Sequence, residues 1–369
     1  MSVLSKPLPL RLADAFSAQA TACAELRSNF SALLCALLAR DGVPEGPVHD
    51  KLSELTNSNI DLGPSGASVP LRFLGALHRL VLDGTSPALV AAYPPHLHPG
   101  ETGLASVLNE AIVEHGEAIS GFLANAPQTN ETGRSAALAP AFALLAKRYG
   151  LPFKVSELGA SAGLNLNWPL YHIDYGQWSV GAHDSDLKID CRWHGPTLEP
   201  TEMLVADAQG CDVHPMLLET QQQRNALLAY IWPEQPERLA RLKAALTAAA
   251  KHVPDIVAQD AATFVKARLK TPSPGQCHVI YHTIAWQYFP QDQQLAAGQA
   301  IEEAAALAKF DAPLVWLRFE ADNHEGGKGA KLDMTIWDGT SPEGRLIELG
   351  RADFHGRWVQ WTGGKALEA

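Results

Sequence analysis

Apolar side chains recur every three or four residues through the first third of the chain, which is the period of an amphipathic α-helix. Residues 10–40, 71–82 and 104–124 all show this spacing, and none of them alternates with the period of two that marks a half-buried strand. We therefore predict that residues 1–125 form an α-helical lobe.

Beyond residue 125 the pattern changes to short apolar runs separated by helical segments. The runs that indicate buried strands are Phe153–Leu158, Met203–Cys211, Asp255–Ala258, His278–His282 and Leu314–Phe319. Strands that alternate with helices are typical of a parallel sheet. Three alternating segments near the C-terminus predict an antiparallel meander at one sheet edge: Lys331–Trp337, Arg345–Leu349 and Arg357–Trp361. Residues 126–369 are thus expected to form an α/β domain, a Rossmann-like sheet of parallel strands with a C-terminal antiparallel hairpin.

Residues 167–200 do not fit a plain doubly wound sheet, because they are dense in tryptophan, tyrosine and histidine and contain turn signals. We predict a small aromatic insertion within the α/β domain. Two interpretations stay open: a cover that folds over a ligand site, or a hydrophobic minicore of its own.

Composition narrows the class of protein. The chain has 369 residues, of which 46% are hydrophobic and 19% charged, as in a folded globular protein. A net charge of −11, without any run rich in lysine and arginine, disfavours nucleic acid as a partner. The apolar runs are far shorter than a membrane span, and the five cysteines are scattered. We expect a cytoplasmic protein that acts on a small-molecule substrate, with no nucleic acid or membrane partner.

The most informative stretch is the turn after the first predicted strand, Glu157-x-Gly159-x-Ser161-x-Gly163. Glycines permit a sharp turn and a close approach of a ligand to the backbone. Helix-forming residues follow, so we expect free amide donors at a helix N-terminus, which favours an anion. The spacing is not that of a dinucleotide site. A strand-to-helix turn without a ligand is the structural alternative.

This pattern resembles motif I of the class I S-adenosylmethionine-dependent methyltransferases, Glu/Asp-x-Gly-x-Gly-x-Gly, with Ser161 in place of the middle glycine. The resemblance implies a Rossmann-like sheet and S-adenosylmethionine as the cofactor. It also implies that the turn cradles this methyl donor, through Glu157, Gly159, Ala160, Ser161 and Gly163.

Two acidic residues follow the next two predicted strands. Asp212 comes after the second strand, where a carboxylate can accept both ribose hydroxyls of a nucleoside. Asp260, followed by Ala261, comes after the third strand and is predicted to hold the adenine amino group. Either acid can instead cap the helix that follows it.

The fourth strand runs into a segment where the methyltransferase resemblance implies substrate-facing residues. His282 is the predicted general base because an imidazole titrates near neutrality, with a structural histidine as the alternative. Trp286 and Tyr288 are predicted to stack on adenine or substrate. A sulfonium donor also needs a partner for its positive charge, which aromatic faces and a carboxylate such as Glu157 or Glu320 supply.

Residues 127–134 are rich in hydrogen-bonding side chains and lead into a predicted helix. Asn130, Glu131 and Arg134 are predicted at the rim of the substrate pocket, together with Glu320. The alternative is that they cap this helix and pack against it.

A second constellation competes with this site. Cys191-x-x-His194 and Cys211-x-x-His214 are two pairs with the short spacing of zinc ligands. The pairs fall in different predicted elements, so we predict no resident metal and keep a zinc site as an alternative.

Several longer strings together resemble the DUF2332 family of uncharacterised bacterial proteins: QTNETGRSAAL, ELGASAGLNLNW, GCDVHP, YIWPEQPERLARL, YHTIAWQYFP and PLVWLRFE. The resemblance extends over almost the whole chain. It implies the helical lobe and a methyltransferase-type C-terminal domain, but it brings no established reaction. We therefore predict methyl transfer from S-adenosylmethionine to an unidentified small molecule. A nucleotide- or metabolite-binding sensor without catalysis is the alternative.

Overall fold

The chain folds into two compact units. The structure is a computed structural model that describes residues 5–57, 60–63, 66–199, 201–322 and 328–363. One unit comprises Met1–Thr129 together with Leu217–Ala240, and the other comprises Asn130–Met216 together with Arg241–Ala369. The division at residue 130 lies close to the boundary expected near residue 125, but the return of the chain to the first unit was not expected.

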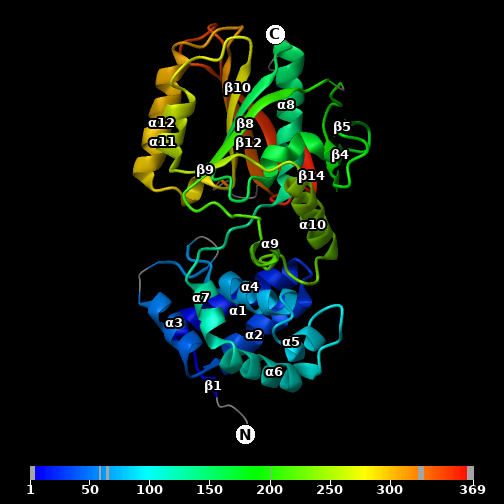
Figure 1. The fold of residues 1–369 in the computed structure, drawn as a ribbon, viewed down its shortest axis with the longest axis vertical. Coiled ribbons are helices and arrows are strands. Elements are labelled where there is room, and N and C mark those ends of the chain that lie inside the picture. The colour runs from blue at the N-terminus through cyan, green and yellow to red at the C-terminus, as the bar shows by residue number, and fades with distance from the viewer. Residues whose placement is uncertain (1–4, 58–59, 64–65, 200, 323–327, 364–369) are drawn as a thin grey trace. The chain divides into compact units, whose positions relative to one another are not determined.

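The first unit is helical (Figure 1). Its helices are α1 (Leu10–Glu25), α2 (Asn29–Asp41), α3 (Pro47–Thr56), α4 (Val69–Leu82), α5 (Pro87–Ala92), α6 (Gly100–Glu114), α7 (Gly116–Leu123) and α9 (Gln221–Leu228). A short antiparallel pairing of β1 (Ser5–Lys6) with β2 (Val43–Pro44) joins them. Of the helices in the described part of the chain, none is long and apolar enough to cross a membrane.

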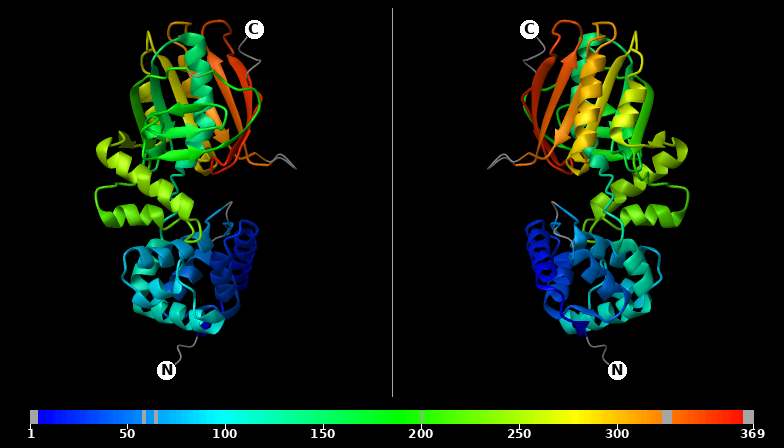
Figure 2. Two further views of the ribbon diagram at one scale, coloured as in Figure 1. Left: turned by 90° about the vertical axis from the view of Figure 1, so that its right-hand side faces the viewer. Right: turned by 90° about the vertical axis from the view of Figure 1, so that its left-hand side faces the viewer.

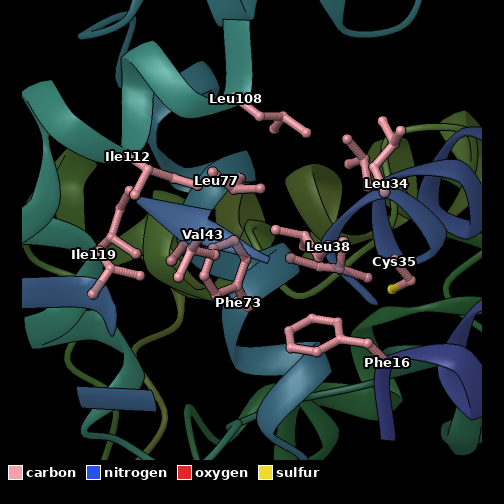
Figure 3. Packing of buried hydrophobic residues seen from close by; sticks show 14 of the residues in the cluster. Phe16, Leu34, Cys35, Leu38, Val43, Phe73, Leu77, Leu108, Ile112 and Ile119 are labelled. Atoms are coloured by element: carbon pink, nitrogen blue, oxygen red, sulfur yellow. The ribbon is translucent and has the colours of Figure 1, made fainter. Parts of the chain in front are cut away.

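The apolar stripes of these helices meet in one core. Phe16, Leu38, Phe73 and Leu77 are each less than 4% exposed and point toward one another (Figure 3). Two of the expected helices are each divided in the structure. Residues 10–40 form α1 and α2 because Arg27 adopts a left-handed conformation (φ 61°), and residues 104–124 form α6 and α7.

Residues 217–240 belong to the helical unit because their polar groups are bonded there. Asn225 donates to the Asp83 carboxylate at 2.7 Å, and a ring nitrogen of His78 lies 3.3 Å from the carbonyl of Ala229. The Glu234 carboxylate accepts both the backbone N–H and the hydroxyl of Ser31, at 2.7 and 2.8 Å. Pro233 lies between α9 and α10 (Pro236–Lys251), and the second proline, Pro236, is the first residue of α10.

The second unit is built on a mixed nine-stranded sheet, with the order β7-β14-β13-β12-β11-β10-β3-β8-β9. Five neighbouring strands of this sheet pair in parallel: β3 (Phe153–Leu158), β8 (Val205–Asp212), β9 (Ile256–Ala258), β10 (Cys277–Thr283) and β11 (Leu314–Glu320). The expected antiparallel meander is confirmed as β12 (Ala330–Trp337), β13 (Arg345–Ala352) and β14 (Trp358–Trp361). The unit is therefore an α/β fold.

Helices cover both faces of this sheet. The pair α11 (Ala261–Arg268) and α12 (Gln291–Ala305) lies on one face, and α8 (Ser135–Tyr149) lies on the other (Figure 2). Phe142 of α8 packs edge-on against Phe153, with ring centroids 5.0 Å apart. The α11–α12 pair shares a core with Leu158 and Ile280 from the opposite face of the strands.

The aromatic insertion is present; it forms a small sheet of its own and also adds a strand to the main sheet. It contains a three-stranded sheet of β4 (His172–Asp174), β5 (Ser179–Gly181) and β6 (Lys188–Asp190). Its last strand, β7 (Arg192–His194), pairs in parallel with β14 and so extends the main sheet. Tyr175 and Trp178 stack at 4.2 Å and are both buried, as expected of a minicore.

Candidate functional site

The order of the sheet reverses between β3 and β10. The chain moves outward from β3 to β8 and β9 on one side, and then returns to place β10 and β11 on the other. Ligands of open α/β sheets bind outside the carboxyl ends of the strands at such a reversal. The two connections that leave this point are the turn at 159–163, called the elbow below, and the segment 284–290 after β10.

The elbow has a strained backbone. Gly159, Ser161 and Gly163 all have positive φ angles, of 70°, 53° and 69°. Such a conformation costs a residue with a side chain about 1–2 kcal/mol, so Ser161 is strained where the glycines are not. Ile284, which follows β10, is also left-handed (φ 50°), which is rarer still for a β-branched residue. Strain therefore concentrates on both sides of the reversal.

The glycines of the elbow are needed by the protein's own packing. A Cβ added at Gly159 would lie 2.8 Å from the Cβ of Ala285, and one added at Gly163 would lie 2.6 Å from Pro254. The close approach expected from a ligand is therefore made by neighbouring side chains at these two positions.

An α-helix does not follow the elbow. Residues Leu164–Leu170 form a 3₁₀ helix with Pro169 inside it. The amide of Leu164 donates to the Asn130 side chain at 2.7 Å, and the amide of Ala160 donates to the carbonyl of Cys211. The expected anion site at a helix N-terminus is thus wrong, because these amide donors already have partners.

Asp212, at the end of β8, points to the elbow. One carboxylate oxygen accepts the amide of Ser161 at 2.9 Å, and the other accepts the amide of His214 at 2.9 Å. A carboxylate has about four acceptor positions, so both oxygens can accept a further donor. The structure places this expected ribose-binding acid beside the strained turn.

Asp260 caps a helix, which is the alternative considered from the sequence. It is the N-cap of α11, whose first residue is Ala261. Its two carboxylate oxygens accept the amide and the hydroxyl of Thr263, at 2.9 and 2.8 Å. These bonds lower the pKa of Asp260 below its usual value. The structure therefore accounts for Asp260 as a cap, and it does not support the adenine role.

Glu157 is buried at the end of β3, opposite Tyr281 of β10 in the register of the sheet. One oxygen of Glu157 and the hydroxyl of Ser161 are buried without a hydrogen-bond partner, and the hydroxyl of Tyr281 adjoins the Glu157 carboxyl. Burial raises the pKa of Glu157 to about 8, against the opposing influence of Tyr281 and Arg134. Buried polar atoms without partners are uncommon, so the second oxygen of Glu157 and the Ser161 hydroxyl mark this place as unusual.

His282 lies on the opposite face of the sheet from Glu157, because successive residues of a strand alternate between faces. One ring nitrogen lies 2.6 Å from the Glu320 carboxylate, and the other accepts the indole N–H of Trp316 at 3.1 Å. The ring is 1% exposed and stacks on Trp286 at 4.7 Å. Both nitrogens are occupied by protein groups, so the structure does not support His282 as a general base.

Glu320 joins the ends of β10 and β11. The oxygen that contacts His282 also accepts the amides of Ala285 and Trp286, at 3.0 and 3.2 Å. Glu320 therefore fixes the segment after β10 and does not lie free at a pocket rim. Trp286 packs inward against His282, whereas Tyr288 is 59% exposed at the edge of the unit.

The segment 130–134 lies against the turn between β13 and β14. The Glu131 carboxylate accepts the amide of Gly133 at 3.1 Å and pairs with Arg241 at 3.0 Å. Arg134 donates to the carbonyls of Thr283 and Phe354, at 2.8 and 3.2 Å. Asn130, Glu131 and Arg134 thus adjoin the elbow and β10, and their bonds are those of the packing alternative.

The zinc alternative is not supported. Within the residues that the structure describes, no three His, Cys, Asp or Glu side chains are arranged to hold a metal ion. Cys191 has Asp353 as its acidic neighbour, whereas Cys211 lies near Asp212 and Glu157 at the elbow.

The interpretation of the sequence as having no Gly-x-Ser-x-Gly elbow is wrong at Ser161. The residue stands at the centre of Gly159-x-Ser161-x-Gly163, the pattern of a nucleophile elbow, in which a serine occupies a strained strand-to-helix turn. The tyrosine pair of Tyr281 and Tyr171 near Glu157 was also missed, because only the pairing of β3 with β10 brings Tyr281 to that carboxyl.

Comparison with known proteins gives one family. A family model described as "Uncharacterized protein conserved in bacteria (DUF2332)" matches residues 13–361. Neither the curated proteins nor the solved structures contain a match.

Proposed function

The chain belongs to the DUF2332 family, and for this member we propose S-adenosylmethionine-dependent methyl transfer to a small molecule at the reversal between β3 and β10. One observation carries the proposal. The carboxylate of Asp212 lies at the end of the strand next to β3 and contacts the strained elbow at Ser161. A nucleoside bound at this reversal would meet that acid through its ribose hydroxyls.

The strand order supports the proposal. In chain order the parallel strands β9-β8-β3-β10-β11 read 3-2-1-4-5, which is the order of a doubly wound nucleotide-binding sheet. The meander β12–β14 departs from that order, because β12 pairs directly with β11. The methyltransferase-type arrangement is therefore proposed for the parallel strands.

The residues fit an adenosyl group in part. The partnerless oxygens of Glu157 and Ser161 are buried at the elbow and can accept or donate hydrogen bonds there. Asp212 retains acceptor positions for ribose hydroxyls. Asp260 does not fit, because Thr263 satisfies both of its oxygens.

Bound S-adenosylmethionine would supply an electrophilic methyl group on a positively charged sulfur. The protein's part is then alignment and exclusion of water, which lower the barrier by pre-arranging the reacting groups. Asp212 would hold the ribose, and Glu320 with His282 would position the segment 284–288 that carries Trp286 and Tyr288. No residue at this site is assigned as the base.

Titration calorimetry with S-adenosylmethionine and with S-adenosylhomocysteine tests the proposal. We expect saturable heat for the wild type and an affinity about 10–100-fold lower for Asp212→Asn, which loses charged hydrogen bonds worth about 1.5–3 kcal/mol. Asp207→Asn is the matched control, since Asp207 lies in the same strand and pairs with Arg268. Absence of both heat and a thermal shift in the wild type would contradict the proposal.

A second measurement distinguishes methyl transfer from the alternative, a sensor that binds a ligand without catalysis. Mass spectrometry of molecules retained by the purified protein identifies a ligand without assuming a reaction. A retained nucleotide or metabolite other than the methyl donor or its product would favour binding without methyl transfer.

The Ser161 pattern favours a second candidate, a serine-dependent acyl hydrolase. Its geometry is incomplete, because the Ser161 hydroxyl has no hydrogen-bonded base and both nitrogens of His282 are engaged elsewhere. A fluorophosphonate probe decides between the two. Labelling of the wild type but not of Ser161→Ala would favour serine-dependent hydrolysis over methyl transfer as the function.

A further inference from the structure

A small cavity opens at the amino ends of the parallel strands, at the opposite end of the sheet from the reversal. Its deepest lining residues are His278, near the start of β10, and Leu314, at the start of β11, which are 4% and 5% exposed. Leu307, which is 57% exposed, lies at its mouth. The cavity volume is about 30 Å³, which is room for about two water molecules, so a ligand there must be small.

A chain of hydrogen bonds determines which nitrogen of His278 carries the proton. Nε of Arg268 donates to the hydroxyl oxygen of Ser156 at 3.0 Å, since a guanidinium cannot accept. That hydroxyl lies 2.9 Å from Nε2 of His278, which is the one acceptor for its hydrogen within the described residues. Burial, Lys154 and Arg268 hold the pKa of His278 well below its ordinary value, so the ring is neutral. A neutral ring that accepts at Nε2 carries its hydrogen on Nδ1.

The Nδ1–H group of His278 is an unused donor. In the part of the chain that the structure describes, no hydrogen bond joins it to another group, and it is not among the partnerless side-chain atoms that are sealed from solvent. Because His278 lines the cavity, a ligand there can accept this hydrogen bond.

The other polar groups at the cavity also favour an acceptor. Ser273, which lines it, accepts a hydrogen bond from the Lys154 ammonium at 3.3 Å, so its own hydroxyl hydrogen is left to donate. Thr271 adds a second hydroxyl. Among the described residues no acid lines the cavity, and Asp207, whose charge acts on Lys154, is itself paired with Arg268 at 3.0 Å. Donors and positive charge without a lining acid favour an anion.

The walls of the cavity are apolar. Leu269, Leu307 and Leu314 form them together with alanines and prolines. Apolar walls disfavour an anion that is charged on all sides, such as phosphate, because its hydration is not replaced there. They favour an anion with an alkyl chain, whose burial removes apolar surface from water.

We propose that this cavity binds a short aliphatic monocarboxylate. Its carboxylate accepts hydrogen bonds from Nδ1 of His278 and from the hydroxyl of Ser273, and its alkyl chain lies between Leu269 and Leu307 toward the mouth. The inference does not depend on the proposed methyl transfer, because the two sites lie at opposite ends of the strands.

Saturation-transfer NMR of the full-length protein with propionate, at constant ionic strength, tests the proposal. We expect saturable binding of propionate and about tenfold weaker binding of propionamide, which has a similar shape without the charge. Inorganic phosphate should also bind more weakly than propionate, because it has no alkyl chain to bury. No binding of propionate, or equal binding of propionamide or phosphate, would overturn the proposal.

Variants locate the binding. Ala304→Leu fills the cavity from α12 and should abolish propionate binding, whereas Ala306→Leu, at an exposed position outside the lining, is the matched control and should bind as the wild type does. His278→Gln places an amide near the position of Nε2 but has no donor at Nδ1, so it should weaken binding about tenfold.

Circular dichroism checks that each variant is folded. Unchanged propionate binding in folded Ala304→Leu would show that the ligand binds elsewhere and would refute the site. This variant decides the question by itself if His278→Gln does not fold, because it leaves the hydrogen bonds of His278 and Ser156 in place.

Discussion

Burial in the fold changes the protonation of Glu157. A glutamate on an exposed loop stays ionised at neutral pH, but this one is 2% exposed and one of its oxygens has no partner. Its neighbour across the strand pair is Tyr281, which favours the charged carboxylate but does not offset the effect of burial. Burial disfavours the charged carboxylate, so Glu157 carries its proton in the folded protein up to a pKa of about 8.

Replacement of Glu157 by glutamine should remove a dependence of stability on pH. The folded protein holds the proton up to about pH 8, whereas the unfolded chain releases it near the ordinary glutamate pKa of 4.5. The associated stabilisation is complete below pH 4.5 and is lost as the pH rises to 8, with a slope of up to about 1.4 kcal/mol per pH unit. Urea unfolding of the wild type and of Glu157→Gln between pH 5 and 8 measures this slope.

The exposed Glu348→Gln is the control, and it should behave as the wild type. An equal pH slope in Glu157→Gln and the wild type would show that this carboxyl is ionised in the folded protein.

At the scale of elements, the ends of the parallel strands show how one residue type takes two roles. Asp212 and Asp260 both follow a strand, but Asp212 has no α-helix directly after it and binds the elbow instead. Asp260 is followed at once by α11, whose first amides need acceptors. The presence or absence of a helix directly after the acid thus decides which backbone amides its carboxylate can reach.

The role of Asp260 as a cap gives a direct expectation. Asp260→Ala should lower the free energy of unfolding by about 0.5–2 kcal/mol, because the amide of Thr263 loses its acceptor at the start of α11. Asp260→Asn keeps an acceptor oxygen and should cost less. Chemical denaturation compares the variants, and calorimetry checks that neither changes ligand affinity. A loss of affinity in a stable Asp260→Asn protein would restore the adenine role.

At the scale of the whole molecule, the chain crosses between two units instead of filling them one after the other. Residues 217–240 are bonded to α4 and α2 through Asn225, His78 and Glu234. Tyr230 also packs on Phe122, with ring centroids 5.3 Å apart. Residues 217–240 therefore pack against the helical unit although they are remote from it in sequence. We expect this segment to lose stability whenever the helical core is destabilised.

Hydrogen exchange tests this dependence. Phe73→Ala leaves a cavity in the helical core and should cost about 3–5 kcal/mol. We expect amides of α9 to lose protection together with those of α4, by a similar factor. Amides of β3 and β10 serve as the internal reference. Unchanged protection of α9 in a variant with a destabilised α4 would contradict the assignment of residues 217–240 to the helical unit.

The sequence by itself determined the elements. The mostly apolar runs at 153–158 and 314–319 are strands in the structure almost residue for residue, because a strand covered on both faces is rich in apolar residues. The helical lobe could likewise be predicted from local sequence, because its apolar side chains recur with the period of an α-helix. The turn at 159–163 could also be located, since positive φ angles require glycine at two of its positions.

Only the tertiary structure decided what the side chains at the site contact. His282 looked like a free base in the sequence, yet Trp316 and Glu320 of the neighbouring strand occupy both of its nitrogens. Tyr281 meets Glu157 because β10 pairs with β3, and β7 joins the main sheet because it pairs with β14. These contacts join residues far apart in the chain. Hydrophobic periodicity encodes which residues are buried, whereas the partner of each buried polar group depends on strand order and register, which no local pattern specifies.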